Sequence, residues 1–297
     1  MQADILGESG NRFEIENNRI NGSVKSGIWR RIITSDDIRR WNVSTPKEAA
    51  FFPYDTSNGD YELISEEKFE SEYGDTYELL VEHQGDLLDR KDSRRTWRQL
   101  GRPWYSLFRT GTPDYFEKDK IVTDVVVSDP HFCIDTNGYL FENGFILGIT
   151  PLETDPYYLT GLLNTDAIFA YLKPISPPKN SGYIELFVDQ LEQVPVHLPE
   201  IRADLCADIE NVLAKHEEKF KQLRQSIQTD GVNEVVDSSE KSELITANLI
   251  REISKKIVEE YDSLSSEEIE QLEQLNNVLV GELYDLTEGE LRSLSQI

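Results

Sequence analysis

Cysteine, methionine and histidine are scarce in this sequence, whose 297 residues include 2 cysteines, 1 methionine and 4 histidines. Neither Cys133 nor Cys206 has a Cys or His at metal-ligand spacing, so we expect two buried thiols and neither a disulfide nor a zinc site. The histidines show no ligand pattern either, and His216 stands on an apolar helical face, as a core residue does. The sequence therefore predicts no metal site.

Long apolar runs are also missing, and none approaches the roughly 18 residues that a membrane span needs. Residues 1–9 lack the basic start and apolar stretch of a signal peptide. Hydrophobic residues still make up 38% of the chain, as in globular proteins, and its length allows one large domain or two smaller ones. We expect a cytoplasmic protein without a membrane segment.

Common catalytic motifs are absent as well. The chain has no G-x-x-x-x-G-K-[ST] loop, no G-x-G-x-x-G after a strand and no G-x-S-x-G elbow. Residues 128–132 (SDPHF) follow an apolar strand, where adenine methyltransferases place an Asn/Asp-Pro-Pro-aromatic motif that holds a flipped base. Here His131 replaces the second proline, and no Gly-rich cofactor loop precedes the motif. The carboxylates of residues 114–119 are too closely spaced for a nuclease site. We expect no catalytic residue in this chain.

Basic residues are few, because 30 Lys and Arg face 56 Asp and Glu, which gives a formal net charge of -26. Taken alone, this charge argues against nucleic-acid binding. One explanation is a protein that mimics DNA and binds a DNA-binding enzyme. The other is an acidic proteome from a halophilic source, where molar salt reduces the Debye length to about 3 Å. We favour the halophilic source.

The charge reverses between residues 90 and 109, which we call the basic segment. It contains seven basic residues and one acid, Asp92, for a net charge of +6, with Trp97, Trp104 and Tyr105 interleaved. Such a segment suits a phosphate-contacting surface, although its arginines could equally pair with surplus carboxylates. A pure DNA mimic has little use for it. A weaker basic patch lies beside Trp29 and Trp41 and comprises Lys25, Arg30, Arg31, Arg39 and Arg40.

Hydrophobic periodicity predicts the α+β class. Strand-like segments occur at residues 28–33 and 51–54, and Ser65 caps a helix over residues 65–73. Apolar runs at 121–127, 131–135, 139–141 and 145–149, separated by Asn-Gly pairs, predict a small antiparallel sheet. A helix is expected over residues 157–172. Helical spacing at 201–227, 249–261 and 269–283 predicts a long-helix hairpin or bundle. We therefore expect an α/β domain over residues 1–199 and a helical region over residues 200–297.

Residues from about 18 to 199 resemble the C-terminal specificity domain, or target-recognition domain, of TaqI-like and Eco57I-like restriction-modification adenine methyltransferases. The order of the fragments carries the resemblance, which covers more than half of the chain. The missing N-terminal methyltransferase and the extreme acidity depart from the family pattern. The similar stretches are residues 28–33 (IWRRII), 36–41 (DDIRRW), 87–90 (LLDR), 101–104 (GRPW), 120–122 (KIV), 132–139 (FCIDTNGY), 158–165 (YLTGLLNT), 191–196 (LEQVPV) and, near the end, 282–287 (ELYDLT).

The resemblance implies a non-catalytic module that recognises a DNA sequence for a restriction-modification or related phage-defence system. It would be a separate specificity subunit or part of a longer or split enzyme. Its expected partners are double-stranded DNA and a catalytic methyltransferase or nuclease, and S-adenosylmethionine would bind that partner or a missing N-terminal part. The alternative is the acidic DNA mimic.

Within this hypothesis the basic segment and its neighbours contact DNA. Trp97 and Trp104 have a second interpretation as buried anchors, and Arg102 as a structural residue. Gly101 and Gly138 are expected in turns with positive φ. The expected DNA-contacting residues are Arg94, Arg95, Arg98, Arg102, Trp104, Arg109, Lys118 and Lys120.

Overall fold

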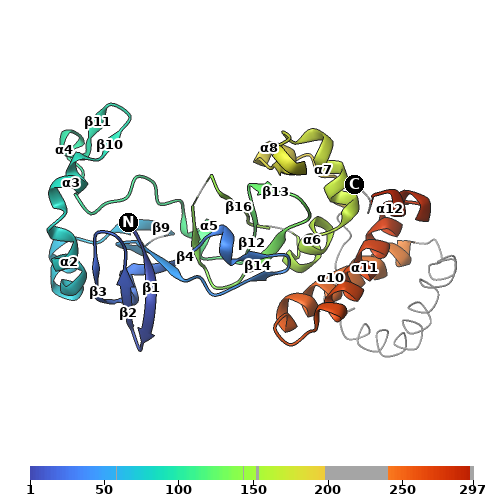
Figure 1. Cartoon of the computed structure of the whole chain (residues 1–297), viewed down its shortest axis with the longest axis horizontal. Helices are drawn as coiled ribbons and strands as arrows, with labels where there is room; N and C mark the ends of the chain where they lie inside the picture. Colours follow the sequence, from blue (N-terminus) through green and yellow to red (C-terminus); the bar gives the residue numbers. More distant parts are fainter. Residues whose placement is uncertain (58, 143, 152–153, 198–239, 295–297) are drawn as a thin grey trace. The chain divides into compact units, whose positions relative to one another are not determined.

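The computed structural model describes residues 1–57, 59–142, 144–151, 154–197 and 240–294. The chain divides into two compact units that alternate along the sequence (Figure 1). Unit 1 comprises Met1–Ile38, Val43–Lys120 and Asp135–Thr150. Unit 2 comprises Arg39–Asn42, Ile121–Ile134 and Pro151–Ile297.

A six-stranded sheet organises unit 1, in the order β15-β4-β7-β1-β2-β3. Its neighbours run antiparallel, except that β15 is parallel to β4. In β2 the side chains of Phe13 and Ile15 alternate with exposed glutamates, which is the two-residue period of a half-buried strand. The strands are β1 (Gln2–Ser9), β2 (Arg12–Glu16), β3 (Asn21–Lys25), β4 (Trp29–Ile33), β7 (Glu48–Phe51) and β15 (Leu140–Phe141).

Three short helices complete the core of unit 1: α1 (Glu66–Glu72), α2 (Gly74–Val81) and α3 (Gln84–Asp89). The predicted cap is present, because Ser65 Oγ accepts a hydrogen bond from the Lys68 backbone N–H at 3.1 Å. Phe69 of α1 is fully buried, and its ring centroid lies 5.5 Å from that of Phe51, which in turn lies 5.7 Å from Trp29. This aromatic cluster joins the helices to the sheet.

Smaller elements fill the rest of unit 1. The antiparallel pair β8 (Tyr54–Ser57) and β9 (Asp60–Leu63) precedes α1, and β16 (Ile146–Ile149) follows β15. The others are η1 (Ser26–Ile28), η2 (Ser35–Asp37), β10 (Lys91–Asp92), β11 (Arg95–Thr96), α4 (Trp97–Leu100) and α5 (Pro113–Phe116). The short strands β5 (Ile38–Arg39) and β6 (Asn42–Val43) include the residues where the chain changes unit.

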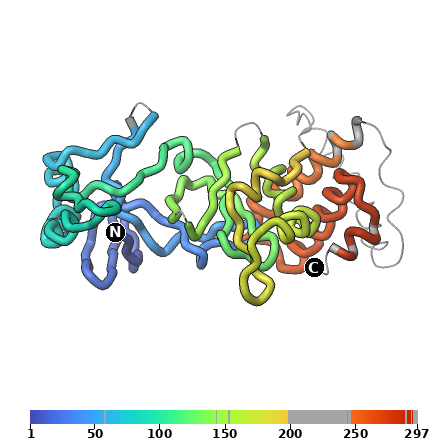
Figure 2. The backbone as a smooth tube through the Cα atoms, turned by 90° about the horizontal axis from the view of Figure 1, so that it is seen from above, coloured from blue at the N-terminus to red at the C-terminus, as the bar shows by residue number. Residues whose placement is uncertain are grey.

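Helices dominate unit 2. Helix α6 (Pro156–Leu163) lies beside α10 (Glu240–Glu260), which packs on α11 (Ser266–Leu283) (Figures 1 and 2). The contact between α6 and α10 requires Gly161, since an added Cβ would lie 2.3 Å from Ser254 Oγ. The remaining elements are η3 (Asn180–Gly182), α7 (Asp166–Ile175), α8 (Val188–Leu191), α12 (Glu288–Leu294), β12 (Lys120–Asp124), β13 (Val126–Val127), β14 (Phe132–Asp135) and β17 (Ile184–Glu185).

Trp41 belongs to the core of unit 2, although most of its neighbours in sequence belong to unit 1. Its backbone has φ 74°, a left-handed conformation that is costly for a bulky residue. The Trp41 backbone N–H donates to Phe132 O at 3.0 Å, and its Nε1 donates to Glu273 Oε1 at 2.5 Å. Burial beside Tyr158 and Ile250 offsets the strain.

The predicted α+β class is confirmed, and the helices expected over 249–261 and 269–283 are present as α10 and α11. The helix expected over residues 201–227, with Cys206 and His216, lies outside the described residues. The boundary expected between residues 199 and 200 lies there too. Within residues 1–199 the chain passes between the two compact units several times.

Two local features differ from the simplest prediction. After the turn at Asn137-Gly138, β15 pairs in parallel with the distant strand β4 instead of folding back as a hairpin. Leu140 and Phe141 are both buried, so this strand needs cover on both faces. The helix expected over residues 157–172 is two helices, α6 and α7, because Asn164 and Thr165 interrupt it.

Candidate nucleic-acid interface

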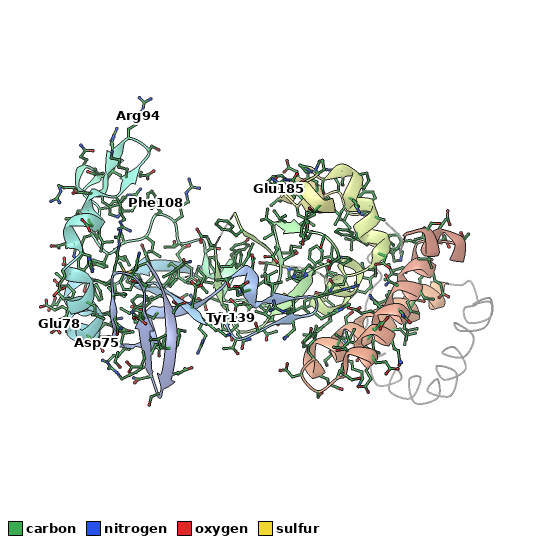
Figure 3. The ribbon with its side chains drawn as sticks, viewed as in Figure 1. Asp75, Glu78, Arg94, Phe108, Tyr139 and Glu185 are labelled. Atoms are coloured by element: carbon green, nitrogen blue, oxygen red, sulfur yellow. The ribbon has the colours of Figure 1, made fainter. Side chains whose placement is uncertain are left out.

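The basic segment begins with a two-stranded antiparallel ribbon. Lys91 in β10 is opposite Thr96 in β11, and Asp92 is opposite Arg95. The turn between them consists of Ser93 and Arg94, with Ser93 at φ 59°. Arg94 therefore stands at the tip of the ribbon, and its side chain points away from it (Figure 3).

Trp97 directly follows the ribbon and is the first residue of helix α4, and we call this buried residue the base of the ribbon. Thr96 and Gln99 form a capping box that starts α4, and Gly101, at φ 64° as expected, ends the helix. The Trp97 ring is fully buried, and its Nε1 donates to Ser106 Oγ at 3.0 Å. These contacts anchor the residue at which the ribbon joins α4.

Arginine side chains within the segment hold the base together. Arg90 donates to the backbone carbonyls of Leu87, Trp104 and Ser106 at 2.8 to 3.0 Å. The guanidinium groups of Arg90 and Arg102 each lie 4.8 Å from the Trp97 ring centroid. Burial lowers the pKa of the Arg90 guanidinium, which nevertheless stays charged at neutral pH. Arg90 therefore has a structural role.

Other cationic groups remain available at the surface. Lys91, Arg94, Arg95 and Arg109 are exposed, and none has an ion-pair partner among the residues that the structure describes. Arg98 lies 3.4 Å from Asp89, and Arg102 lies 3.6 Å from Asp92; both pairs are solvent-exposed. Exposed pairs contribute only about 0–1 kcal/mol, so they leave these arginines free to exchange partners.

Trp104 is a correction to the predicted contact set, because its side chain is buried in the core of unit 1. Its Nε1 donates to Glu66 Oε1 at 2.7 Å, and its ring packs against Phe69 and Tyr105. The alternative interpretation, a buried anchor, describes Trp104. The same interpretation holds for Trp97.

Lys120 is the second correction. Its side chain is fully buried, with Nζ 2.5 Å from Asp135 Oδ2 and 3.0 Å from Phe116 O. Desolvation lowers the pKa of Lys120, while Asp135 acts in the opposite direction. A side chain so enclosed does not reach DNA. Lys118, by contrast, is exposed and pairs at 3.1 Å with Asp114, four residues earlier.

The weaker basic patch is largely occupied by contacts within each unit. Arg30 binds Glu117 and the Gly138 carbonyl, whose residue has the expected positive φ of 69°. Arg31 binds Glu8. The further contacts are Lys25 with Glu72 O, and Arg40 with Glu273 and Asn164 O. These cationic side chains therefore stabilise the fold.

The segment that resembles a methyltransferase motif, residues 128–132, has a structural role. Phe132 begins β14 and is buried, and its backbone N–H and C=O both bond to the Asn164 side chain, at 2.9 and 2.8 Å. His131 lies 3.5 Å from Asp124 and 4.0 Å from Asp129. With Phe132 held in this way, its ring is not free to stack on a flipped base.

Across the described ranges, no group of three or more His, Cys, Asp or Glu side chains is placed to hold a metal ion. Among the helices that the structure describes, none is long and apolar enough to cross a membrane.

The matched part of the sequence contains α1 to α8 and the whole basic segment. Residues 65–196 match the family model of the TaqI-like C-terminal specificity domain. The predicted resemblance is thereby confirmed over this stretch, which is under half of the 297 residues. No curated protein matches the chain. The specificity domain supports a role in DNA recognition within restriction-modification systems.

Two further residues of the basic segment are exposed, and the sequence patterns predicted neither as a DNA contact. One is Lys91, which contributes to the net charge of +6. Phe108 is 49% exposed, and its ring centroid lies 4.4 Å from that of Trp97 (Figure 3). The only signal in the sequence is its place beside Arg109, because exposure of a phenylalanine depends on the fold.

Proposed function

We propose that this chain is a sequence-specific DNA-recognition module or subunit of a restriction-modification adenine methyltransferase, and that it is not itself catalytic. One observation carries the proposal. The match to the specificity domain spans a segment of net charge +6 whose Arg94, Arg95 and Arg109 are exposed and unpaired among the described residues. Such groups bind phosphates and the edges of bases.

The ribbon of β10 and β11 is the element that enters the DNA. A two-stranded ribbon fits the major groove, where every base pair shows a distinct pattern of donors and acceptors. Arg94 and Arg95 stand at the tip, and an arginine fork pairs with guanine O6 and N7. Lys91, Arg98, Arg102, Arg109 and Lys118 lie farther from the tip and bind phosphates, which fixes register.

A catalytic partner supplies the chemistry. It holds S-adenosylmethionine, flips the target adenine and methylates it, or cuts the DNA. The hairpin of α10 and α11 lies outside the matched specificity domain and serves as the spacer or docking element for that partner.

A gel shift and a pull-down, each done at low salt and in about 2 M KCl, test the proposal, because phosphate binding weakens with salt while an acidic fold is stabilised by it. We expect the chain to capture a methyltransferase and the pair to shift a specific duplex. Failure of the chain and the pair to shift any duplex would contradict the proposal.

The acidic DNA mimic is the second candidate, and α1 to α3 favour it. Residues 66–89 carry nine carboxylates and one lysine, a net charge of -8. A mimic would bind a DNA-binding enzyme through these carboxylates and compete with DNA for it. In the same pull-down, capture of such an enzyme with displacement by added duplex would replace the recognition role.

A further inference from the structure

We propose that Phe108 contacts the 5-methyl group of a thymine in the groove that the basic segment enters, and so helps to select the DNA sequence. The inference rests on the proposed DNA-recognition function. It adds an apolar contact to a surface that is otherwise cationic.

The Phe108 ring is exposed and also held in place. Its centroid lies 4.4 Å from that of Trp97, with 58° between the ring planes. Trp97 is itself fixed by Ser106 and by the guanidinium groups of Arg90 and Arg102. The preceding residue is anchored as well, since the Leu107 backbone N–H donates to Tyr54 Oη at 2.8 Å. A rigid aromatic group loses little conformational entropy when it binds.

Charge around the ring indicates what it contacts. Phe108 is followed by exposed Arg109, and its neighbour Trp97 directly follows β11, which contains exposed Arg95. A surface this cationic favours DNA over an apolar protein face. Among the base edges of the major groove, the thymine methyl is the apolar group, and phenylalanine is one of the side chains that contact it.

Phe145 offers a matched control. It belongs to unit 1 and is 65% exposed, but it lies outside the basic segment. Exposure alone therefore does not distinguish the two phenylalanines. Of the two, Phe108 is the one that packs against Trp97 and is directly followed by the unpaired Arg109.

The test measures binding of the full chain to duplexes that differ by one methyl group. A preferred site is first selected from a pool of random duplexes, and each thymine in it is then replaced singly by deoxyuridine. Losing one buried methyl contact should weaken binding by the wild type roughly four-fold at one position. The Phe108→Ala variant should bind the two duplexes equally. The Phe145→Ala and Phe108→Leu variants should keep most of the difference.

Two results would overturn the inference while leaving the proposed function intact. One is equal binding of the thymine and deoxyuridine duplexes by the wild type at every position. The other is a Phe108→Ala variant, folded by circular dichroism, that still discriminates at the same position. A wild type that binds no duplex would instead contradict the proposed function, and this inference with it.

Discussion

At the scale of single residues, Lys120 and Asp135 form an ion pair that is wholly enclosed within unit 1. The Asp135 carboxylate also accepts hydrogen bonds from the backbone N–H groups of Asn137 and Tyr139, at 2.8 and 2.9 Å. The pair thus ties the first residue of β12 to the turn before β15. Removing one member of such a pair leaves a buried charge without a partner.

We predict that Lys120→Met lowers the free energy of unfolding by about 3–5 kcal/mol, because the Asp135 carboxylate is left uncompensated. The exposed residue Lys118 is the control, and Lys118→Met should change it by under about 0.5 kcal/mol. Denaturant unfolding measures both. DNA affinity per folded Lys120→Met molecule should stay that of the wild type, and a loss specific to this variant would restore Lys120 as a contact.

Glu282 supports a prediction about pH. Burial raises the pKa of its carboxyl above the usual 4.5, and its Oε2 is buried without a hydrogen-bond partner among the described residues. An acid whose pKa is raised by folding loses stability as pH rises from the unfolded pKa through the folded pKa. Glu282→Gln should therefore be more stable than the wild type at pH 7, and the gap should close below about pH 4.5. Equal melting temperatures at pH 7 would rule out this role of burial.

At the scale of elements, Asn164 joins α6 to β14. Its side-chain amide accepts from the Phe132 N–H and donates to the Phe132 carbonyl, while Thr165 caps α7 by accepting from the Ile168 N–H. Asn164 is fully buried, so its two bonds satisfy backbone groups that water does not reach. The break between α6 and α7 is thus required by a strand that lies 32 residues earlier.

We predict that Asn164→Ala lowers the free energy of unfolding by roughly 2–4 kcal/mol, because it leaves the buried backbone N–H and C=O of Phe132 without these hydrogen-bond partners. Asn164→Asp replaces the donor with an acceptor and buries a carboxylate beside the Phe132 carbonyl, so near pH 7 it should destabilise the fold at least as much as Asn164→Ala. Denaturant unfolding with unchanged m-values distinguishes lost stability from a changed denatured state. A silent Asn164→Ala substitution would show that these bonds contribute nothing.

Local signals in the sequence predicted the parts that depend on local contacts. The Ser65 cap, the turn at Gly138, the helices α10 and α11 and the basic segment all follow from neighbouring residues. Distant partners decided the rest. The pairing of β15 with β4 joins Leu140 to Ile32, and Trp104 is buried because Glu66 and Phe69 receive it. No pattern near residue 104 or 120 indicates such partners.

At the scale of the whole molecule, two segments of opposite net charge are consecutive in the sequence. Residues 66–89 carry a net charge of -8 and residues 90–109 a net charge of +6. The acidic helices repel phosphates, and the basic segment attracts them. We expect the two segments together to restrict DNA to the basic segment and to reduce non-specific binding.

We predict that a triple variant, with Glu67, Glu70 and Glu78 each changed to Gln, binds duplexes of any sequence more tightly than the wild type at low salt. These glutamates are exposed, so the fold should tolerate the change. The gain should shrink in about 2 M KCl, where screening removes the repulsion. Fluorescence anisotropy at both salts measures it, and unchanged affinity at low salt would show that α1 and α2 do not limit binding.

Reversing the charge of the basic segment tests most directly whether this segment binds DNA. Arg94, Arg95 and Arg98 are changed together to Glu, and the control variant makes the same change in net charge at Arg19, Lys47 and Lys256, which are exposed and lie elsewhere. Duplex affinity is measured by anisotropy at low salt, after thermal unfolding shows that both variants fold. We predict a loss of roughly 100-fold or more for the basic-segment variant and a much smaller loss for the control. Equal affinities in the two folded variants would contradict the account.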